Sequence, residues 1–170
     1  MSVAVSSPRP AAYSLGQITL HWIIAALVLF QLAFGDSMGR LASLLRRGET
    51  RGAGDVLMAD LHIYLGIAVL LLVLVRIVLR IRLGAPATPA RGHPLLGRLA
   101  AATHQLFYLL LVAMPVTGLV AEYLYRPMGE FHEAGKPLFI VLILLHVAGA
   151  LFHQFALRDG VLTRMLRPAG

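Results

Sequence analysis

The chain contains seven histidines and no cysteine, so imidazole is the side chain best suited here to bind a transition metal. His132 and His146 are 14 residues apart. On one helix that spacing keeps both rings on a similar face, about 21 Å apart along the axis. His21 and His62 lie near the beginnings of two other long apolar segments. The lack of cysteine excludes disulfides, thiolate metal sites and haem attached through cysteine.

Four apolar segments determine where these histidines lie. The chain is 58% hydrophobic and only 14% charged, and its apolar residues form blocks without the alternation of an outer-membrane barrel. Each block reaches the roughly 20 residues that a helix needs to cross a bilayer. The blocks cover residues 15–34, 61–81, 99–123 and 137–157. We therefore predict an all-α integral membrane protein in which residues 13–168 form one four-helix, up-down-up-down bundle.

The distribution of Lys and Arg predicts that both termini lie in the cytoplasm. The N-terminal segment, the second connection with its helix ends, and the C-terminal segment hold nine Lys or Arg and one acid, Asp159. The other side holds six Lys or Arg and seven acids. Excess positive charge marks the cytoplasmic side of membrane proteins. The net charge of +7 thus reflects topology and attraction to anionic lipids, and we expect no nucleic-acid partner.

The connections differ in length and composition. Residues 1–12 are expected to be a flexible tail, and the Pro- and Gly-rich residues 84–94 a cytoplasmic connection. The first outer connection, residues 36–60, contains the stretch MGRLASLLRR, which is suited to a short amphipathic helix on the outer surface. The second outer connection, residues 122–136, is short. We expect residues 15–34 to be a retained helix, because no convincing cleavage site of a signal peptide follows them.

Pro137 bears on the geometry of the last helix. It follows His132 by five residues and has no N–H to donate within a helix. We therefore expect either a kink at this position or a helix that begins close to Lys136, with His132 in the preceding turn.

Depth in the membrane groups the histidines into two pairs. His21 begins the first helix on the cytoplasmic side, at the depth of His146, and His62 begins the second helix on the outer side, at the depth of His132. Each pair joins two helices at one depth, as bis-histidine haem ligation requires. For an isolated histidine, a hydrogen bond to a neighbouring helix would be the simpler explanation.

The surroundings of the pairs favour haem over a bare metal ion. No carboxylate lies in the apolar segments near them to complete a zinc or di-iron site. Gly66 and Gly149 are small residues that would leave room for a macrocycle. Arg76, 14 residues after His62, faces the bundle at the depth of the inner pair. Its guanidinium could pair with a haem propionate or extend to the cytoplasmic interface, and the two explanations are about equal.

Two further histidines lie near the inner pair. His104 begins the third helix, and His153 follows His146 by seven residues on nearly the same face. Neither is needed as a ligand, so together they would form a polar pocket that binds a quinone carbonyl and delivers protons to it. Interfacial histidines facing water or lipid headgroups are the competing explanation. His93, in the second connection, is expected to have no special role.

The apolar segments resemble the bacterial cytochrome b561 family over residues 13–168. The resemblance rests on a histidine–tryptophan pair in the first helix, a histidine followed by glycine and later arginine in the second, a Pro-Val-x-Gly-Leu-Val run in the third, and three ordered histidines in the last. The matching stretches are YSLGQITLHWIIAALVL, LHIYLGIAVLLLVLVRIVLRI, YLLLVAMPVTGLV and FHEAGKPLFIVLILLHVAGALFHQF.

The resemblance implies a bundle that holds two b haems in the bacterial inner membrane. Their axial ligands would be His21, His62, His132 and His146. In superoxide oxidases of this family, superoxide at the outer face supplies electrons and ubiquinone accepts them near the inner haem. The positions that match the quinone site are His104 and His153, which makes a superoxide:ubiquinone oxidoreductase the leading prediction.

Two other functions compete with this prediction. The second outer connection is much shorter than in superoxide oxidases, and the donor would dock beside it. A cytochrome b subunit that receives electrons from a periplasmic dehydrogenase or a small cytochrome is therefore an alternative. A haem-free transporter or anchor is a third, but it leaves six histidines at membrane depth without a role.

Overall fold

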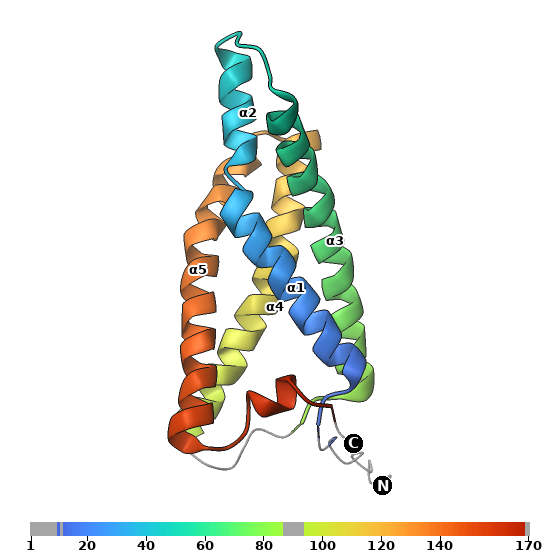
Figure 1. Ribbon diagram of the computed structural model, residues 1–170, viewed down its shortest axis with the longest axis vertical. Helices are drawn as coiled ribbons and strands as arrows, with labels where there is room; N and C mark the ends of the chain where they lie inside the picture. The colour runs from blue at the N-terminus through green and yellow to red at the C-terminus, as the bar shows by residue number, and fades with distance from the viewer. Residues whose placement is uncertain (1–9, 11, 87–93, 169–170) are drawn as a thin grey trace, which may run out of the picture.

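The structure is a computed structural model that describes residue 10, residues 12–86 and residues 94–168 (Figure 1). The tail expected over residues 1–12 and the connection expected over residues 84–94 therefore lie largely outside the described residues. Arg9, Arg91 and the loop histidine His93 lie outside them as well.

Four long helices, joined in antiparallel order, form the bundle. They are α1 (Leu15–Phe34), α3 (Ala53–Leu83), α4 (Pro94–Tyr123) and α5 (Met128–Phe152). Each belongs to a helical run that is long and apolar enough to cross a membrane. No strand occurs among the residues that the structure describes. The predicted all-α, four-helix bundle is confirmed.

The beginning of α1 is fixed by a reciprocal capping box. The Ser14 hydroxyl accepts a hydrogen bond from the Gln17 backbone N–H at 3.3 Å, and the Gln17 side-chain oxygen accepts one from the Ser14 N–H at 3.1 Å. The Gln17 amide nitrogen then donates to the carbonyl of Gly84 at 3.0 Å. The start of the first membrane helix is thereby joined to the end of the second.

A narrow apolar core runs through the middle of the bundle, where α1 packs on α3, α3 on α4 and α4 on α5. The buried core residues are Ile24, Val69, Val73, Leu110, Leu111, Phe139 and Leu142. Large apolar side chains also point away from the bundle: Leu71, Leu109 and Leu144 are each 58–64% exposed. In water so much exposed apolar surface would be unfavourable, whereas lipid chains solvate it.

The last helix begins earlier than the sequence indicates. It starts at Met128 and contains Pro137 in its interior, so the expectation of a start near Lys136 is wrong. The connection after α4 is correspondingly shorter, since residues 128–136 are already helical. Close packing on α4 explains this: the space left by the missing side chain of Gly135 is filled by the Met114 thioether. His132 therefore lies on the same continuous helix as His146.

Two other helices, α3 and α4, also extend beyond the predicted segments, whereas α1 has the predicted bounds. The second membrane helix begins eight residues earlier than predicted, at Ala53, and the third begins five residues earlier, at Pro94. A proline is well tolerated in the first turn of a helix, because its missing N–H would have no intrahelical partner there. Hydropathy alone locates the lipid-crossing part of each helix and misses these polar extensions.

A short helix, α2 (Ser37–Arg46), forms within the first outer connection. It was predicted from its amphipathic pattern, but it stands upright beside the beginning of α3 instead of lying across the end of the bundle (Figure 1). The Ser37 hydroxyl donates to the Met58 carbonyl at 3.3 Å. Lys136 of α5 forms an ion pair with Asp36 at 2.6 Å, which fastens the base of this hairpin to the last helix.

The chain ends in a segment that crosses the opposite end of the bundle. After α5, a π-helical turn covers His153–Leu157 and a 3-10 turn covers Thr163–Met165. We call residues 158–168 the C-terminal strap, because they run from the end of α5 toward the beginning of α1 (Figure 1). The Trp22 indole N–H donates to the Met165 carbonyl at 2.8 Å and holds the strap against α1.

Candidate functional site

The structure brings the four predicted ligands together as two pairs. The rings of His21 and His146 have centroids 6.2 Å apart, and the rings of His62 and His132 have centroids 6.0 Å apart. The first pair joins α1 to α5 and the second joins α3 to α5. The tightest backbone packing lies elsewhere, between α1 and α3, α3 and α4, and α4 and α5. Each pair thus connects helices that are not in close backbone contact.

The spacing within each pair suits one metal ion between the two rings. With imidazole–metal bonds of about 2.0–2.1 Å, two rings on opposite sides of one ion have centroids roughly 6 Å apart. Among the described residues, no cluster of three or more His, Cys, Asp or Glu side chains could hold a metal ion by itself. A metal held by such a pair would need further ligands from a cofactor, and the nitrogens of a porphyrin meet that requirement.

His132 has a backbone partner that orients its ring. Its Nδ1 lies 2.8 Å from the carbonyl oxygen of Met114 on α4, and the Thr117 hydroxyl lies 3.5 Å from the same nitrogen. A carbonyl can only accept, so Nδ1 carries the proton and Nε2 has the lone pair that a metal requires. A hydrogen bond from the ring nitrogen that does not bind the metal is typical of histidine ligands.

Glycines lie against both rings of the outer pair. A side-chain Cβ on Gly35 would come 3.6 Å from His62 Cε1, and one on Gly118 would come 3.1 Å from His132 Cε1. The Nδ1 atom of His62 is buried and has no hydrogen-bond partner within the described part of the chain. An unpaired buried nitrogen costs about 1–3 kcal/mol. These features fit a site whose rings gain partners when haem binds between them.

Neither Gly66 nor Gly149, the small residues expected to leave room for a macrocycle, lies against a ligand ring. Gly66 faces the side-chain amide of Gln31, which would lie 3.4 Å from an added Cβ. That amide donates to the His62 carbonyl at 2.7 Å and so attaches α1 to the ligand-bearing turn of α3. Beyond its own stretch of helix, Gly149 has no heavy atom of a described residue within 4 Å of the position its Cβ would take.

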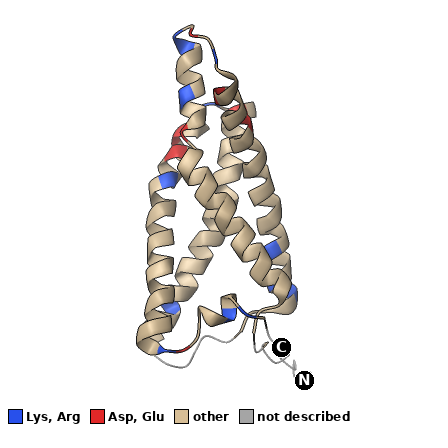
Figure 2. Cartoon of the chain, viewed as in Figure 1, with Lys and Arg blue, Asp and Glu red and all other residues tan. Residues whose placement is uncertain are grey.

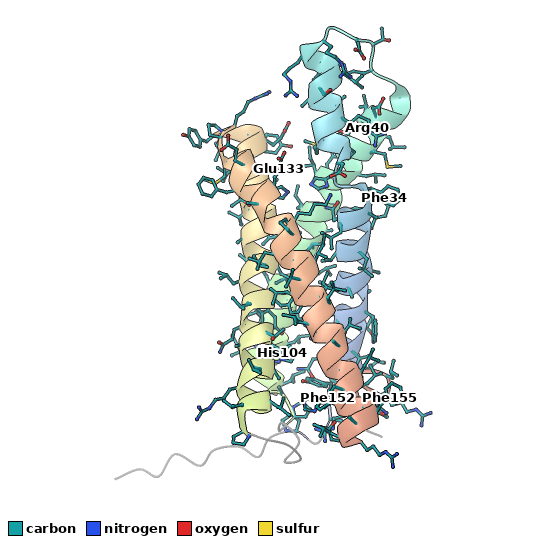
Figure 3. All side chains as sticks on the ribbon, turned by 90° about the vertical axis from the view of Figure 1, so that its left-hand side faces the viewer. Phe34, Arg40, His104, Glu133, Phe152 and Phe155 are labelled. Carbon is teal, nitrogen blue, oxygen red and sulfur yellow. The ribbon has the colours of Figure 1, made fainter. Side chains whose placement is uncertain are left out.

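The inner pair has a third imidazole beside it. The ring of His104, on α4, lies 5.4 Å from that of His146, and the Phe107 ring lies 5.3 Å from His146 on the same side. His146 therefore has two histidine neighbours, and the 6.2 Å separation from His21 is the one closer to the spacing expected for a shared metal. Figure 3 shows His104 near the same end of the bundle as Phe152, with Glu133 at the other end.

Arg76 joins α3 to the beginning of α1 beside the inner pair. Its Nη1 donates to the backbone carbonyl of Gln17 at 2.7 Å, one turn before His21. Its charge acts on both rings of the inner pair. The guanidinium has five N–H donors, and within the described part of the chain the Gln17 carbonyl accepts one of them. A haem carboxylate beside the inner pair would be a suitable further acceptor.

His153 lies at the inner end of the bundle, and its ring is held by a carboxylate that sequence reasoning missed. Its Nδ1 lies 2.5 Å from Oδ2 of Asp159 in the C-terminal strap. The seventh histidine, His93, lies outside the described residues. All six described histidines are partly buried, so each has one side toward the bundle.

The contact between Trp22 and the strap can be tested directly. Trp22→Phe removes the indole N–H and keeps most of the apolar surface, so we expect the free energy of unfolding to fall by about 0.5–1.5 kcal/mol. Thermal unfolding in detergent measures this change, and limited proteolysis should cut the strap faster in the variant. An unchanged melting temperature together with an equally protected strap would contradict the assigned bond.

The fold and the site together define a class of protein: a four-helix membrane bundle with an imidazole pair toward each end. A family model for prokaryotic cytochrome b561 matches residues 12–168. The chain belongs to this family. It is a multi-pass membrane protein of electron transfer, in a family whose members bind haem b.

Two relatives align with nearly the whole chain. Cytochrome b562 of Cereibacter sphaeroides is 40% identical over 162 residues, which cover 92% of this chain and 96% of the relative. A probable superoxide oxidase, CybB, of Yersinia pestis is 27% identical over 176 residues, which cover 91% of this chain and 95% of the relative.

Proposed function

We propose that this chain is a superoxide:ubiquinone oxidoreductase of the bacterial inner membrane that contains two b haems. It takes electrons from superoxide at the α2 end and delivers them to ubiquinone at the opposite end. The observation that carries this proposal is the presence of two facing imidazole pairs in one bundle. Along the unbroken α5, His132 and His146 are separated by about 21 Å, so the pairs lie toward opposite membrane surfaces.

Charge supports the orientation. Figure 2 shows acidic residues gathered at the α2 end of the bundle. Asp159 lies at the other end, where it bonds to His153. The cations at the opposite end include Arg80, Arg82 and Arg98 on the helices and Arg164 in the strap. The positive-inside rule then assigns the strap and both termini to the cytoplasm, and the α2 hairpin to the periplasm.

Each site residue has a role in this proposal. His62 and His132 hold the outer haem, and His21 and His146 hold the inner haem, with Arg76 beside the inner pair to receive a propionate. Each bound haem b would supply a one-electron iron couple. The apolar core between the pairs keeps water out of the middle of the bundle. His104 and His153 are placed to bind the quinone head and to deliver the protons that its reduction consumes.

The relative named a probable superoxide oxidase favours superoxide as the donor. Superoxide is a small anion, so it needs no large docking surface, and exposed cations near the outer pair would steer it. Arg40 on α2 and Lys136 on α5 lie at that end, although Lys136 is partly neutralised by Asp36. Steering of this kind weakens as ionic strength rises.

A second candidate function is that of a cytochrome b subunit that relays electrons from a periplasmic dehydrogenase or small cytochrome to quinone. One observation favours it: the hairpin of α2 and the start of α3 rises past the outer ends of α4 and α5 (Figure 1). This hairpin offers a protein more contact surface than a small anion needs.

A superoxide pulse distinguishes the two candidates. We expect the oxidised, haem-loaded protein in detergent to be reduced with a second-order rate constant approaching about 10⁸ M⁻¹ s⁻¹, near the diffusional limit. Superoxide dismutase should abolish the reduction, and added ubiquinone should reoxidise the protein. Slow reduction by superoxide, together with rapid reduction by a small periplasmic cytochrome, would reject the oxidase and support the subunit.

A further inference from the structure

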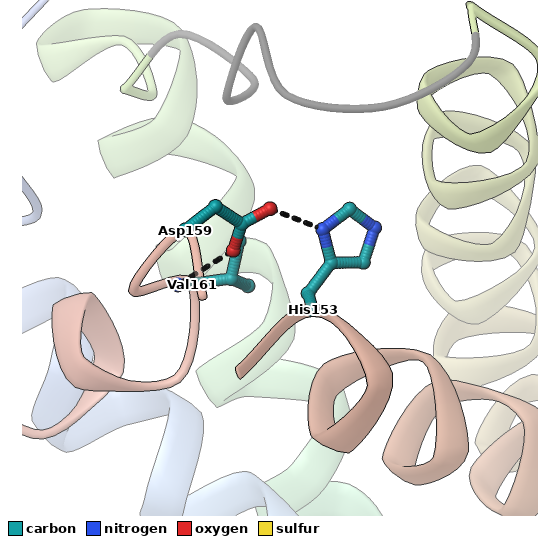
Figure 4. Close-up of polar contacts among 3 residues, drawn as sticks. All are labelled: His153, Asp159 and Val161. Atoms are coloured by element: carbon teal, nitrogen blue, oxygen red, sulfur yellow. Dashed lines mark hydrogen bonds and ion pairs between the residues drawn. The ribbon is translucent and has the colours of Figure 1, made fainter. Parts of the chain in front are cut away.

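At the inner end of the bundle, a buried carboxylate is bonded to a histidine. Oδ2 of Asp159 lies 2.5 Å from Nδ1 of His153 (Figure 4). The Asp159 side chain is 2% exposed, and the His153 side chain is 14% exposed. Asp159 is also the single acid that the sequence assigns to this end. A buried acid is costly unless it is paired, so its position calls for a specific reason.

The backbone after α5 is shaped to make this contact. In a regular α-helix, residues six apart are about 9 Å apart along the axis and point in different directions. Here the helix widens into the π-turn His153–Leu157, and Arg158 adopts a left-handed conformation with φ of 51°. The backbone N–H groups of Arg158 and Asp159 both donate to the His153 carbonyl. The chain therefore turns back and brings Asp159 to the ring. Such π-turns and left-handed non-glycine residues are frequent at functional sites.

Hydrogen bonds determine which ring nitrogen carries a proton. Oδ1 of Asp159 accepts from the Val161 backbone N–H at 3.3 Å, which leaves Oδ2 for His153 (Figure 4). An ionised carboxylate can only accept, so His153 Nδ1 must be protonated. The bond from Nδ1 therefore leaves Nε2 as the nitrogen that can bond to another molecule.

We propose that Asp159 is a positioning residue for quinone reduction. It holds the His153 ring through Nδ1–H and stabilises the doubly protonated ring, from which Nε2 donates a proton to the quinone oxygen. This inference rests on the proposed quinone site. Its geometry is that of a carboxylate behind a catalytic imidazole, where the acid stabilises the protonated ring without itself being protonated.

The proton balance follows from the bonds. Reduction of a quinone to a quinol takes up two electrons, which the haems supply, and two protons. With Asp159 ionised, His153 can carry protons on both nitrogens. Transfer of the Nε2 proton to a quinone oxygen leaves a neutral ring with its Nδ1–H still bonded to Asp159, and water at the cytoplasmic surface returns the proton. The second proton is delivered by a repeat of this cycle.

Asparagine at position 159 should reverse the ring's tautomer. If the amide oxygen keeps the Val161 N–H, the amide nitrogen faces His153 Nδ1 as a donor, so the ring proton moves to Nε2. The neutral ring can still donate a hydrogen bond to the quinone. Loss of that proton would leave an anionic ring, so proton transfer should slow while quinone binding persists.

The test measures reoxidation of reduced, haem-loaded protein by a soluble ubiquinone analogue. We expect Asp159→Asn to lower the rate at saturating quinone by about 10- to 100-fold, with little change in KM. Asp159→Glu, which keeps the charge, should recover part of the rate. Thr163→Val is the matched control, because it removes an exposed strap hydrogen bond, from Thr163 to Gln154, and leaves the pair intact.

A second readout reports the ring directly. Histidine labelled with nitrogen-15, with His153→Gln to assign the signal, reports the tautomer by NMR under conditions in which the ring is neutral. The proton should lie on Nδ1 in the unaltered protein and on Nε2 in Asp159→Asn. An Asp159→Asn rate within about threefold of the unaltered protein, an equal slowing in Thr163→Val, or an unchanged tautomer would each overturn the inference. If His153→Gln also fails to slow reoxidation, the proposed quinone site itself is wrong. If His153→Gln slows it and Asp159→Asn does not, only the role of Asp159 is rejected.

Discussion

His62→Ala is expected to lower the haem content from two to one per chain and to remove the outer haem. His62 is one of two rings whose centroids lie 6.0 Å apart. Among the described residues, no group of three or more His, Cys, Asp or Glu side chains could hold a metal ion in place of the pair. The partner ring, His132, remains held by the Met114 carbonyl at 2.8 Å, so the fold around the site should persist. His21→Ala is expected to remove the inner haem instead and to leave the outer one.

Haem content and redox titration together check this result. The pyridine haemochrome assay gives haem per chain, and a potentiometric titration should show a different one of two transitions missing in each variant. The double variant should bind no haem. If both single variants retained two haems, the assignment of ligands would be wrong.

His104 provides the sharpest control for the inner site. Its ring is closer to His146 than the ring of His21 is, at 5.4 Å against 6.2 Å. We expect His104→Ala to retain both haems, because His104 is assigned to the quinone. If His104→Ala lost the inner haem while His21→Ala kept it, the inner ligands would be His104 and His146.

Much of the fold could be predicted because lipid imposes a simple rule on sequence. A helix that crosses the hydrocarbon must be apolar along its whole length, so hydropathy located all four crossings. α1 begins and ends where predicted, because Ser14 caps its first turn and Gly35 follows its last residue as the C-cap. The outer start of α5 could not be predicted, because close packing on α4 at Gly135, which no local pattern records, keeps the chain helical through Pro137.

Part of the site could also be predicted, because one spacing of 14 residues relates both histidines and glycines of the site. Fourteen residues take a helix through nearly four turns, from the depth of one pair to that of the other. This spacing separates His132 from His146, and it also separates His21 from Gly35 and His104 from Gly118. Gly35 and Gly118 are the glycines that lie against the outer rings. The signal for them was therefore present in the sequence, whereas Gly66 and Gly149 were chosen by their proximity along the chain.

The pairing of His153 with Asp159 could not be found in this way. Helical periodicity places residues six apart on different faces, so a search for side chains that share a face excludes this pair. The contact depends on a π-turn followed by a left-handed residue, Arg158, and neither has a reliable local signature. A single acid on the basic side of the protein was the available clue, since it departs from the pattern that topology requires.

Gly118→Leu is expected to abolish the outer haem as completely as loss of a ligand does. A Cβ at position 118 would lie 3.1 Å from His132 Cε1 and 3.2 Å from its Nδ1. The further carbons of leucine would need the space that the ring occupies, so the ring must move and its bond to the Met114 carbonyl must break. Overpacking of this kind costs about 1–3 kcal/mol. It should displace the ligand without unfolding a bundle that is held along four helices.

The same assays separate a blocked site from a misfolded protein. Gly118→Leu should keep one haem with the redox transition of the inner site, which shows that the bundle has assembled. Gly118→Ala should reduce outer haem occupancy less, because a single methyl group requires the ring to shift by only a few tenths of an ångström. Gly39→Leu is the matched control. Gly39 lies on α2, and beyond its own stretch of helix no described residue has a heavy atom within 4 Å of its Cβ position, so both haems should remain. Two haems with unaltered transitions in Gly118→Leu would mean that His132 does not need its present position, and the outer ligand pair would have to be reassigned.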